Sequence, residues 1–234
     1  MMLKVRNLTS GYDKSRILFD MSFDVGAGEV VCLLGRNGMG KTTTVRTLMG
    51  LLPAWDGTVE FDGQRLDGLS AARVARLGFG LVPEGRQVFP NLTVHENLKV
   101  AAANRRNETE AWTADRVYEL FPALLERTGS YANLLSGGEQ QMLAIGRALM
   151  TNPRLLILDE ATEGLAPVVR DQIWSCLARL RGLGQSIVVI DKHLKRLLSL
   201  VDTFYVVEKG RVVWSGNAQR VQQDEAIVKG YLSV

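Results

Sequence analysis

The chain has 234 residues, of which 46% are hydrophobic and 23% charged, and its net charge of +3 with dispersed basic residues gives no reason to expect nucleic acid as a partner. No stretch approaches the ~20 apolar residues that span a bilayer, and the N-terminus lacks the apolar core of a secretory signal, so we expect a cytosolic chain. Cys32 and Cys176 each fall inside an apolar pattern, which indicates buried thiols in a reducing compartment, and no metal-ligand spacing of His and Cys exists.

The N-terminal part predicts strands of an antiparallel sheet. Residues 17–25 alternate, and Leu18 is the exception to the pattern. The alternation places these residues on one face: Ile17, Phe19, Met21, Phe23 and Val25. Residues 58–63 read as a further strand that ends in an Asp-Gly turn. We therefore expect an antiparallel β part before and after the first parallel strand.

Residues 30–34 (VVCLL) are an apolar run suited to a buried parallel strand, and GRNGMGKTT follows at 35–43. This segment contains G-x-x-x-x-G-K-[ST], in which glycines let backbone N–H groups form a nest for phosphate oxygens. Lys41 can reach the β- and γ-phosphates, and Thr42 can bind Mg²⁺. A helix follows, with its apolar face at Val45, Leu48, Met49 and Leu52. The residues expected to bind the phosphates are Gly35, Arg36, Asn37, Gly38, Met39, Gly40, Lys41, Thr42 and Thr43.

The middle of the chain changes character. A short strand at 78–83 closes at Pro83, and Thr93–Glu96 then forms a capping box that can start a helix. Helical patterns recur at 110–121 and 139–151. We therefore expect residues 93–151 to form an α-helical subdomain.

Apolar strands return at 155–158, 186–190 and 203–207. A helix between the first two is expected to carry Val169, Ile173, Cys176 and Leu180 on one face, and Lys209-Gly210 is expected to turn a hairpin. The whole pattern predicts a single α/β domain of the P-loop NTPase type with a mostly parallel core sheet. Residues 1–92 and 152–234 would form the core with its antiparallel part, and 93–151 would be appended to it.

The strand LLIL is followed by Asp159 and Glu160, which places two carboxylates at the sheet edge beside the phosphate loop. Asp159 is expected to hold Mg²⁺, and Glu160 to orient or deprotonate an attacking water. The alternative interpretation is a strand that simply ends in two solvated acids.

A second anion site is indicated at LSGGEQQ, residues 135–141, where Ser136, Gly137, Gly138 and Glu139 open a helix. One chain does not easily aim two such sites at one γ-phosphate, but a dimer can, with Ser136 of one protomer closing over the nucleotide of the other. The alternative is a serine N-cap followed by flexible glycines.

The order of these segments, with Ser136 95 residues after Lys41 and Asp159 23 residues after Ser136, resembles the ATP-binding cassette (ABC) family along essentially the whole chain. The resemblance implies an ATPase that uses ATP and Mg²⁺, and that works as a head-to-tail dimer which closes on ATP and reopens after hydrolysis. It also implies that Tyr12 stacks on adenine.

Two segments, 81–98 and 160–167, look like the second ATPase subunit of branched-chain amino-acid importers. In that subfamily Glu84 takes the place of a glutamine near Mg²⁺ and the water, and Phe89, Pro90 and Leu92 lie near the groove that receives a permease helix. The implied partners are a second copy or a homologous ATPase subunit, transmembrane permease subunits and, indirectly, a substrate-binding protein. The implied location is the cytoplasmic face of a bacterial-type plasma membrane.

Two positions depart from the family pattern. Lys192 occupies the place of the usual switch histidine and His193 the next one, so either side chain is a candidate for that role. Residues 163–166 read Glu-Gly-Leu-Ala where the family carries Ser and Asp, which puts cross-dimer contacts of this loop in doubt.

Other readings stay open. A urea or amide importer and a lipid or lipopolysaccharide exporter also use a single short cassette. A soluble ABC ATPase of chromosomes or ribosomes fits less well, because the 95-residue gap leaves no room for a coiled coil and only one cassette is present. A non-enzymatic binding module would be expected to lack Lys41 or Glu160.

Overall fold

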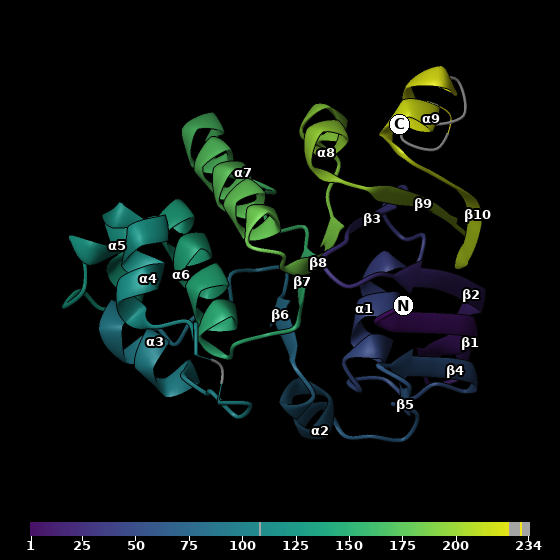
Figure 1. The fold of residues 1–234 in the computed structure, drawn as a ribbon, viewed down its shortest axis with the longest axis horizontal. Coiled ribbons are helices and arrows are strands. Elements are labelled where there is room, and N and C mark those ends of the chain that lie inside the picture. Colours follow the sequence, from purple (N-terminus) through teal and green to yellow (C-terminus); the bar gives the residue numbers. More distant parts are fainter. Residues whose placement is uncertain (108, 225–229, 231–234) are drawn as a thin grey trace.

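The computed structural model of the chain describes residues 1–107, 109–224 and 230. Within these residues the strands form two sheets, one of four strands in the order β2-β1-β4-β5 and one of six in the order β10-β9-β3-β8-β7-β6. Figure 1 shows the smaller sheet at one end of the molecule and a group of helices, α3 to α6, at the other, with the larger sheet between them.

The four-stranded sheet is antiparallel throughout and contains β1 (Leu3–Tyr12), β2 (Ser15–Val25), β4 (Asp56–Phe61) and β5 (Gln64–Arg65). Asp62 and Gly63 join β4 to β5 with φ values of 48° and 78°. Two successive positive φ values are what a type I′ hairpin turn requires, and they explain the Asp-Gly pair. The predicted antiparallel part and its turn are confirmed.

The predicted facing of β2 is only half right. Met21, which pairs with Leu8, and the residues after it alternate as expected, but Ser10 pairs with Leu18, so β2 carries one extra residue in this interval. Asp20 sits in this bulge with φ 58°. A bulge reverses which side chains face inward, and Leu18 is therefore fully buried while Ile17 and Phe19 are half-exposed. The interpretation of Leu18 as the exception was wrong.

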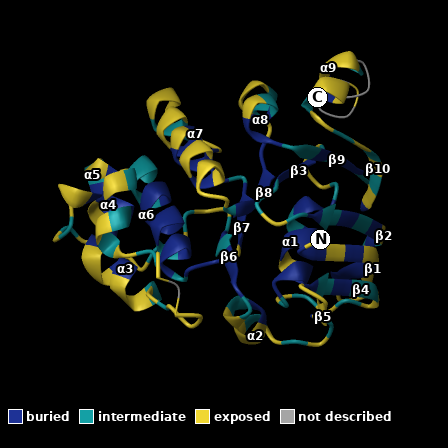
Figure 2. Cartoon of the chain, in the orientation of Figure 1, coloured by how far each residue is buried: buried dark blue, intermediate teal, exposed yellow. Residues whose placement is uncertain are grey.

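The six-stranded sheet is parallel except for its edge strand β10. Every residue of β3, β7 and β8 is buried, as expected for central strands covered on both faces (Figure 2). Because these strands run in one direction, their carboxyl ends meet at one edge of the sheet. The strands are β3 (Val30–Leu34), β6 (Phe79–Val82), β7 (Leu155–Asp159), β8 (Ser186–Ile190), β9 (Thr203–Glu208) and β10 (Arg211–Gly216).

In the part of the chain that the structure describes, these helices accompany the sheets: α1 (Lys41–Leu48), α2 (Ala71–Arg76), α7 (Pro167–Gly182), α8 (Leu194–Leu200) and α9 (Ala218–Gln223). α1 ends at Leu48, so Leu52 lies beyond the helix face on which it was predicted. In α7, Ile173, Cys176 and Leu180 are buried as predicted, and Val169 is half-buried. Pro167 begins α7 because the first helical position needs no N–H donor.

The remaining helices follow one another in the chain: α3 (Val94–Ala101), α4 (Ala114–Leu120), α5 (Pro122–Leu125), a 3₁₀ turn (Ala132–Leu134) and α6 (Gly137–Met150). The capping box at Thr93 is present, because its hydroxyl accepts from the Glu96 N–H and the Glu96 carboxylate accepts from Thr93. α4 begins at Ala114, capped by Thr113, rather than at residue 110. These helices occupy the segment predicted to be helical.

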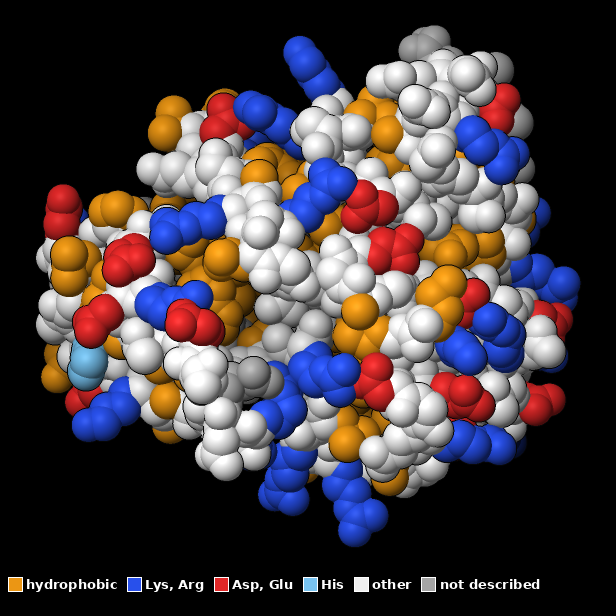
Figure 3. All heavy atoms as spheres, in the orientation of Figure 1, with side chains coloured by type: hydrophobic (Ala, Val, Ile, Leu, Met, Phe, Trp, Pro, Cys, Tyr) orange, Lys and Arg blue, Asp and Glu red, His pale blue; other side chains and the backbone are white. Residues whose placement is uncertain are grey.

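Charged side chains of both signs are interspersed over the face shown in Figure 3, in keeping with the small net charge. Within residues 1–107, 109–224 and 230, no helix combines the length and the apolar character needed to cross a membrane.

Candidate functional site

The loop between β3 and α1 brings the ammonium of Lys41 to the carboxyl edge of the large sheet. Lys41 Nζ donates to the carbonyl oxygens of Gly35 (2.9 Å) and Arg36 (3.0 Å), and the residue is only 7% exposed. Burial lowers the pKa of Lys41, and the nearby carboxylates of Glu160 and Asp159 oppose that effect. A Cβ at Gly35, where φ is 148°, would lie 2.3 Å from the Val207 carbonyl oxygen, so this bend requires glycine.

Asp159, the last residue of β7, meets the first turn of α1. The Thr42 hydroxyl donates to Asp159 Oδ1 at 3.3 Å, although the two residues are 117 positions apart in sequence. Burial raises the pKa of Asp159, and the Thr42 hydrogen bond partly offsets this. Glu84 lines the same groove as Thr42, and its charge also raises the pKa of Asp159. Hydroxyl and carboxylate oxygens are the donors that Mg²⁺ prefers, so this set fits that ion.

Glu160 follows Asp159 in a left-handed conformation with φ 51°, uncommon for a residue with a side chain. Its N–H donates to the Ile190 carbonyl (3.0 Å), which ties the turn to the end of β8. The side chain is 18% exposed, and its Oε1 lies 4.0 Å from Lys41 Nζ. Burial, followed by a hydrogen bond with Glu163, raises the pKa of Glu160 to about 7. A carboxylate that titrates near neutrality is suited to accept a proton from water.

This raised pKa predicts how the stability of the nucleotide-free chain depends on pH. Because the folded-state pKa of about 7 exceeds the unfolded value of 4.5, the folded state holds an extra proton, and stability is lost as pH rises from about 4.5 to 7. Glutamine at position 160 mimics the protonated glutamate, so the Glu160→Gln variant should not lose this stability as pH rises. In thermal unfolding, the Tm of this variant relative to the parent should therefore rise between pH 5 and 7 and level off above. A constant difference would contradict the prediction.

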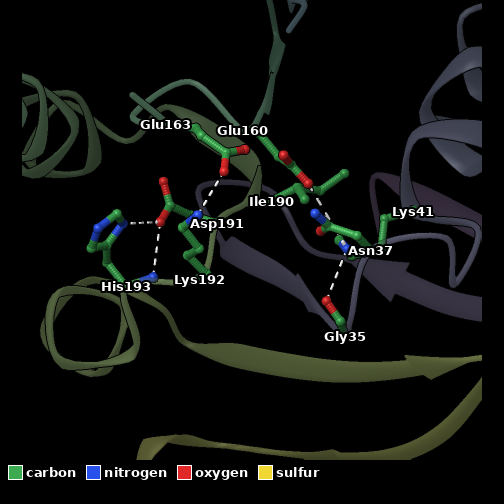
Figure 4. Close-up of a pocket in the computed structure, with 9 residues that line it drawn as sticks. All are labelled: Gly35, Asn37, Lys41, Glu160, Glu163, Ile190, Asp191, Lys192 and His193. Atoms are coloured by element: carbon green, nitrogen blue, oxygen red, sulfur yellow. Dashed lines mark hydrogen bonds and ion pairs between the residues drawn. The ribbon is translucent and has the colours of Figure 1, made fainter. Parts of the chain in front are cut away.

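Two adjoining cavities mark the site. A pocket of about 30 Å³ (Figure 4) is lined by Gly35, Asn37, Lys41, Glu160, Glu163, Ile190, Asp191, Lys192 and His193. A more open groove of about 600 Å³ is lined by Ile17, Asn37, Gly38, Gly40, Lys41, Thr42, Thr43, Glu84, Glu160 and Glu163. The structure therefore brings the phosphate loop, the acidic strand end and residues 190–193 together at one edge of the sheet.

The two candidates for the switch position differ in their contacts. His193 Nε2 lies 2.6 Å from a guanidinium nitrogen of Arg170, which can only donate, so this ring nitrogen accepts. The proton is then on Nδ1, which lies 2.6 Å from Asp191 Oδ1, and the Thr162 hydroxyl donates to the other oxygen of Asp191. Both ring nitrogens of His193 are thus engaged in a polar network. Lys192 instead reaches Glu163, with Nζ 2.6 Å from Oε1.

Other predicted site residues lie outside both cavities. Ser136 is the N-cap of α6 and shares a capping box with Glu139, in which the Ser136 N–H donates to the Glu139 carboxylate at 2.7 Å. Gly137 packs against the Arg86 guanidinium, and a side chain there would clash with it, because a Cβ would be 2.1 Å from one of its nitrogens. Tyr12 ends β1 and is 37% exposed without lining either cavity. Within one chain, neither this helix start nor this tyrosine lines the two cavities at the phosphate loop.

The sequence analysis missed Glu163 and Asp191 as pocket residues. A signal existed, because positions 163 and 192 both depart from the family pattern and carry opposite charges. These two residues of opposite charge follow the predicted strands 155–158 and 186–190 within a few positions, so they could have been predicted to pair.

The chain is similar to a known protein family and to many known proteins. A family model described as "ABC transporter" matches residues 18–163. The chain is 40% identical over 231 residues to the high-affinity branched-chain amino acid transport ATP-binding protein BraG of Pseudomonas aeruginosa, covering 99% of each. It is 34% identical over 229 residues, 97% of each, to a protein of Archaeoglobus fulgidus named as the branched-chain amino acid transport ATP-binding protein LivF.

The lipopolysaccharide export system ATP-binding protein LptB of Escherichia coli is 32% identical over 232 residues, covering 98% of this chain and 96% of LptB. Among solved structures, an ATP-binding subunit of an ABC transporter superposes with a TM-score of 0.83 at 28% identity, covering 99% of this chain and 96% of that one.

Proposed function

The chain belongs to the ABC transporter family and is an ATPase, and from this membership we propose that it powers the import of branched-chain or other hydrophobic amino acids through a membrane permease. Hydrolysis is supported by the convergence of Lys41, Thr42, Asp159 and Glu160 on one cavity edge. Amino-acid import is supported by 40% identity along the full length of a relative that bears that function in its name.

The proposal assigns roles to five residues at the phosphate loop and the carboxyl edge of the sheet. Lys41 binds the β- and γ-phosphates, and Thr42 and Asp159, with Glu84 beside them, would hold Mg²⁺, which when bound offsets phosphate charge. Glu160 orients the attacking water and accepts its proton. Asp159 is the last residue of β7, and Glu160 is the next residue in the chain. The carboxylate that would bind the metal and the carboxylate that orients the water are therefore held close to each other by the backbone.

The proposal includes a head-to-tail dimer. Ser136, Gly137 and Gly138 start the 14-residue helix α6, whose N-terminus favours an anion, but these residues do not line the nucleotide cavities of their own chain. A second copy or a homologous subunit would place its own α6 N-terminus over the γ-phosphate. Tyr12 remains the candidate for stacking on adenine.

The permease is proposed to dock on the segment before α3. Phe89 is 46% exposed, and the Arg147 guanidinium lies 4.2 Å from the centroid of its ring. The backbone of this segment is held on its buried side, because the buried side-chain amide of Asn97 donates to the carbonyls of Phe89 (3.0 Å) and Leu92 (3.1 Å). Pro90 and Leu92 would add apolar surface. The chain would then act at the cytoplasmic face of the membrane, with a substrate-binding protein on the other side.

The second candidate is export of lipopolysaccharide, favoured by the 32% identity to LptB. The segments Val82–Arg86 and 164–167 favour import, because they resemble the amino-acid importer subfamily. A urea or amide importer shares that subfamily resemblance.

Reconstitution with substrate separates these functions. The chain is co-purified with its permease subunits, placed in proteoliposomes, and ATP turnover is measured with a binding protein loaded with leucine, isoleucine or valine. We expect turnover to rise with these amino acids and not with lipopolysaccharide, urea or short amides. A response to one of the latter alone would contradict amino-acid import and support the corresponding alternative.

A further inference from the structure

An exposed ion pair lies on one side of the nucleotide pocket. Glu163 lies in the turn after β7, where its N–H donates to the Glu160 carbonyl (3.2 Å), and Lys192 is the second residue after the end of β8. Lys192 Nζ is 2.6 Å from Glu163 Oε1, and the side chains are 68% and 42% exposed. In Figure 4 the two side chains point toward each other on one side of the pocket, with Lys41 and Gly35 on the other.

Lys192 and Lys41 supply the two permanent positive charges among the described residues that line this pocket. Lys41 is buried and held by two carbonyls of its own loop, so its position is largely set. Lys192 is exposed and is held by one carboxylate. An ammonium on a flexible four-carbon stem can exchange one acceptor for another at little cost.

The neighbouring histidine, His193, makes its hydrogen bonds to Arg170 and Asp191. His193 is held between Arg170 and Asp191, and its backbone N–H donates to Asp191 Oδ1 at 2.9 Å. Asp191 is in turn bonded by Thr162. These hydrogen bonds hold the backbone on both sides of Lys192. The Lys192 side chain is outside this network and can move toward a phosphate.

We propose that Glu163 is a positioning residue that holds Lys192 at the pocket rim and competes for it with the γ-phosphate. This inference rests on the proposed ATP site. Carboxylate and phosphate oxygens are equivalent acceptors for an ammonium, and a terminal phosphate beside Lys41 brings the second acceptor into the same pocket. ATP binding exchanges the Lys192–Glu163 pair for a Lys192–phosphate pair, whereas ADP leaves the first pair intact. Glu163 thereby sets how strongly the site prefers the triphosphate.

The test is the ratio of ATP to ADP affinity in the isolated chain, measured by calorimetry with Mg²⁺ in a Glu160→Gln background, at concentrations where light scattering shows a monomer. This background prevents hydrolysis and removes the ionisation of Glu160. Adding Glu163→Gln should raise ATP affinity about two- to fivefold, the range of an exposed ion pair, and leave ADP affinity unchanged. Lys192→Ala should lower ATP affinity by a similar factor, and Glu163→Gln added to it should then have no further effect.

A matched control is available in the Arg196–Asp171 pair, which joins α7 to α8 outside the pocket. Arg196 Nη2 lies 2.5 Å from Asp171 Oδ1, and the two side chains are 51% and 57% exposed. Asp171→Asn should leave the ATP-to-ADP ratio unchanged. The inference is overturned if Glu163→Gln does not change this ratio, or if its effect persists without Lys192, which would mean that Glu163 acts by its own charge alone. If the parent chain binds neither nucleotide, the proposed ATP site itself fails.

Discussion

Replacing Glu160 with Gln is expected to lower ATP turnover by about 10²–10⁴-fold, the usual contribution of a general base. Glutamine keeps the shape of the side chain and can still orient water, but it cannot accept a proton. Binding of ATP should survive, because Lys41 and Thr42 are untouched and one negative charge near the phosphates is gone. Phosphate release measures turnover, and light scattering with ATP should show a closed dimer that accumulates because it no longer reopens.

The matched control for this variant is Glu126→Gln. Glu126 is exposed after α5 and outside both cavities, so its replacement removes the same charge without touching the site. Its turnover should equal that of the parent. Hydrolysis at the parental rate in the Glu160→Gln variant would show that Glu160 is not the base.

Replacing Lys41 with Ala is expected to weaken ATP binding by about 10- to 100-fold, since a hydrogen bond to a charged group contributes about 1.5–3 kcal/mol. The Lys41 ammonium donates to two carbonyls of its own loop and lies 4.0 Å from Glu160, and alanine removes this buried positive charge from the site. Calorimetry with ATP gives the affinity, and thermal unfolding of the free variant checks that the loop still folds.

Lys195→Ala serves as the control for the loss of a lysine. Lys195 is exposed on α8 and does not line the pocket. ATP affinity should be unchanged in this variant. An unchanged affinity in Lys41→Ala would argue against the assignment of residues 35–43 as the phosphate loop.

The comparison of β2 with β3 shows where reasoning from sequence stops. β3 was predicted with its bounds, because an uninterrupted apolar run needs only burial on both faces. In β2 the alternation was read without the bulge at Asp20, and the faces of Ile17, Leu18 and Phe19 were reversed. A bulge is a property of the pairing of two strands, so one strand's sequence does not reveal it.

The site divides in the same way. The sequence by itself determined the parts that depend on neighbouring residues. These are the glycine loop before Lys41, the strand that leads to Asp159, the capping box at Thr93 and the Asp-Gly turn. Such features follow from local backbone conformation and side-chain type, which a short segment carries with it.

Only the tertiary structure decided which distant side chains meet. It brought Lys192 to Glu163 across 29 residues and His193 to Arg170 across 23. These contacts depend on the order of strands in the sheet and on which loops emerge at the same edge. The number of residues between two positions does not give the distance between their side chains in space. The ion pairs of the pocket were therefore found only once the order of the strands in the sheet was known.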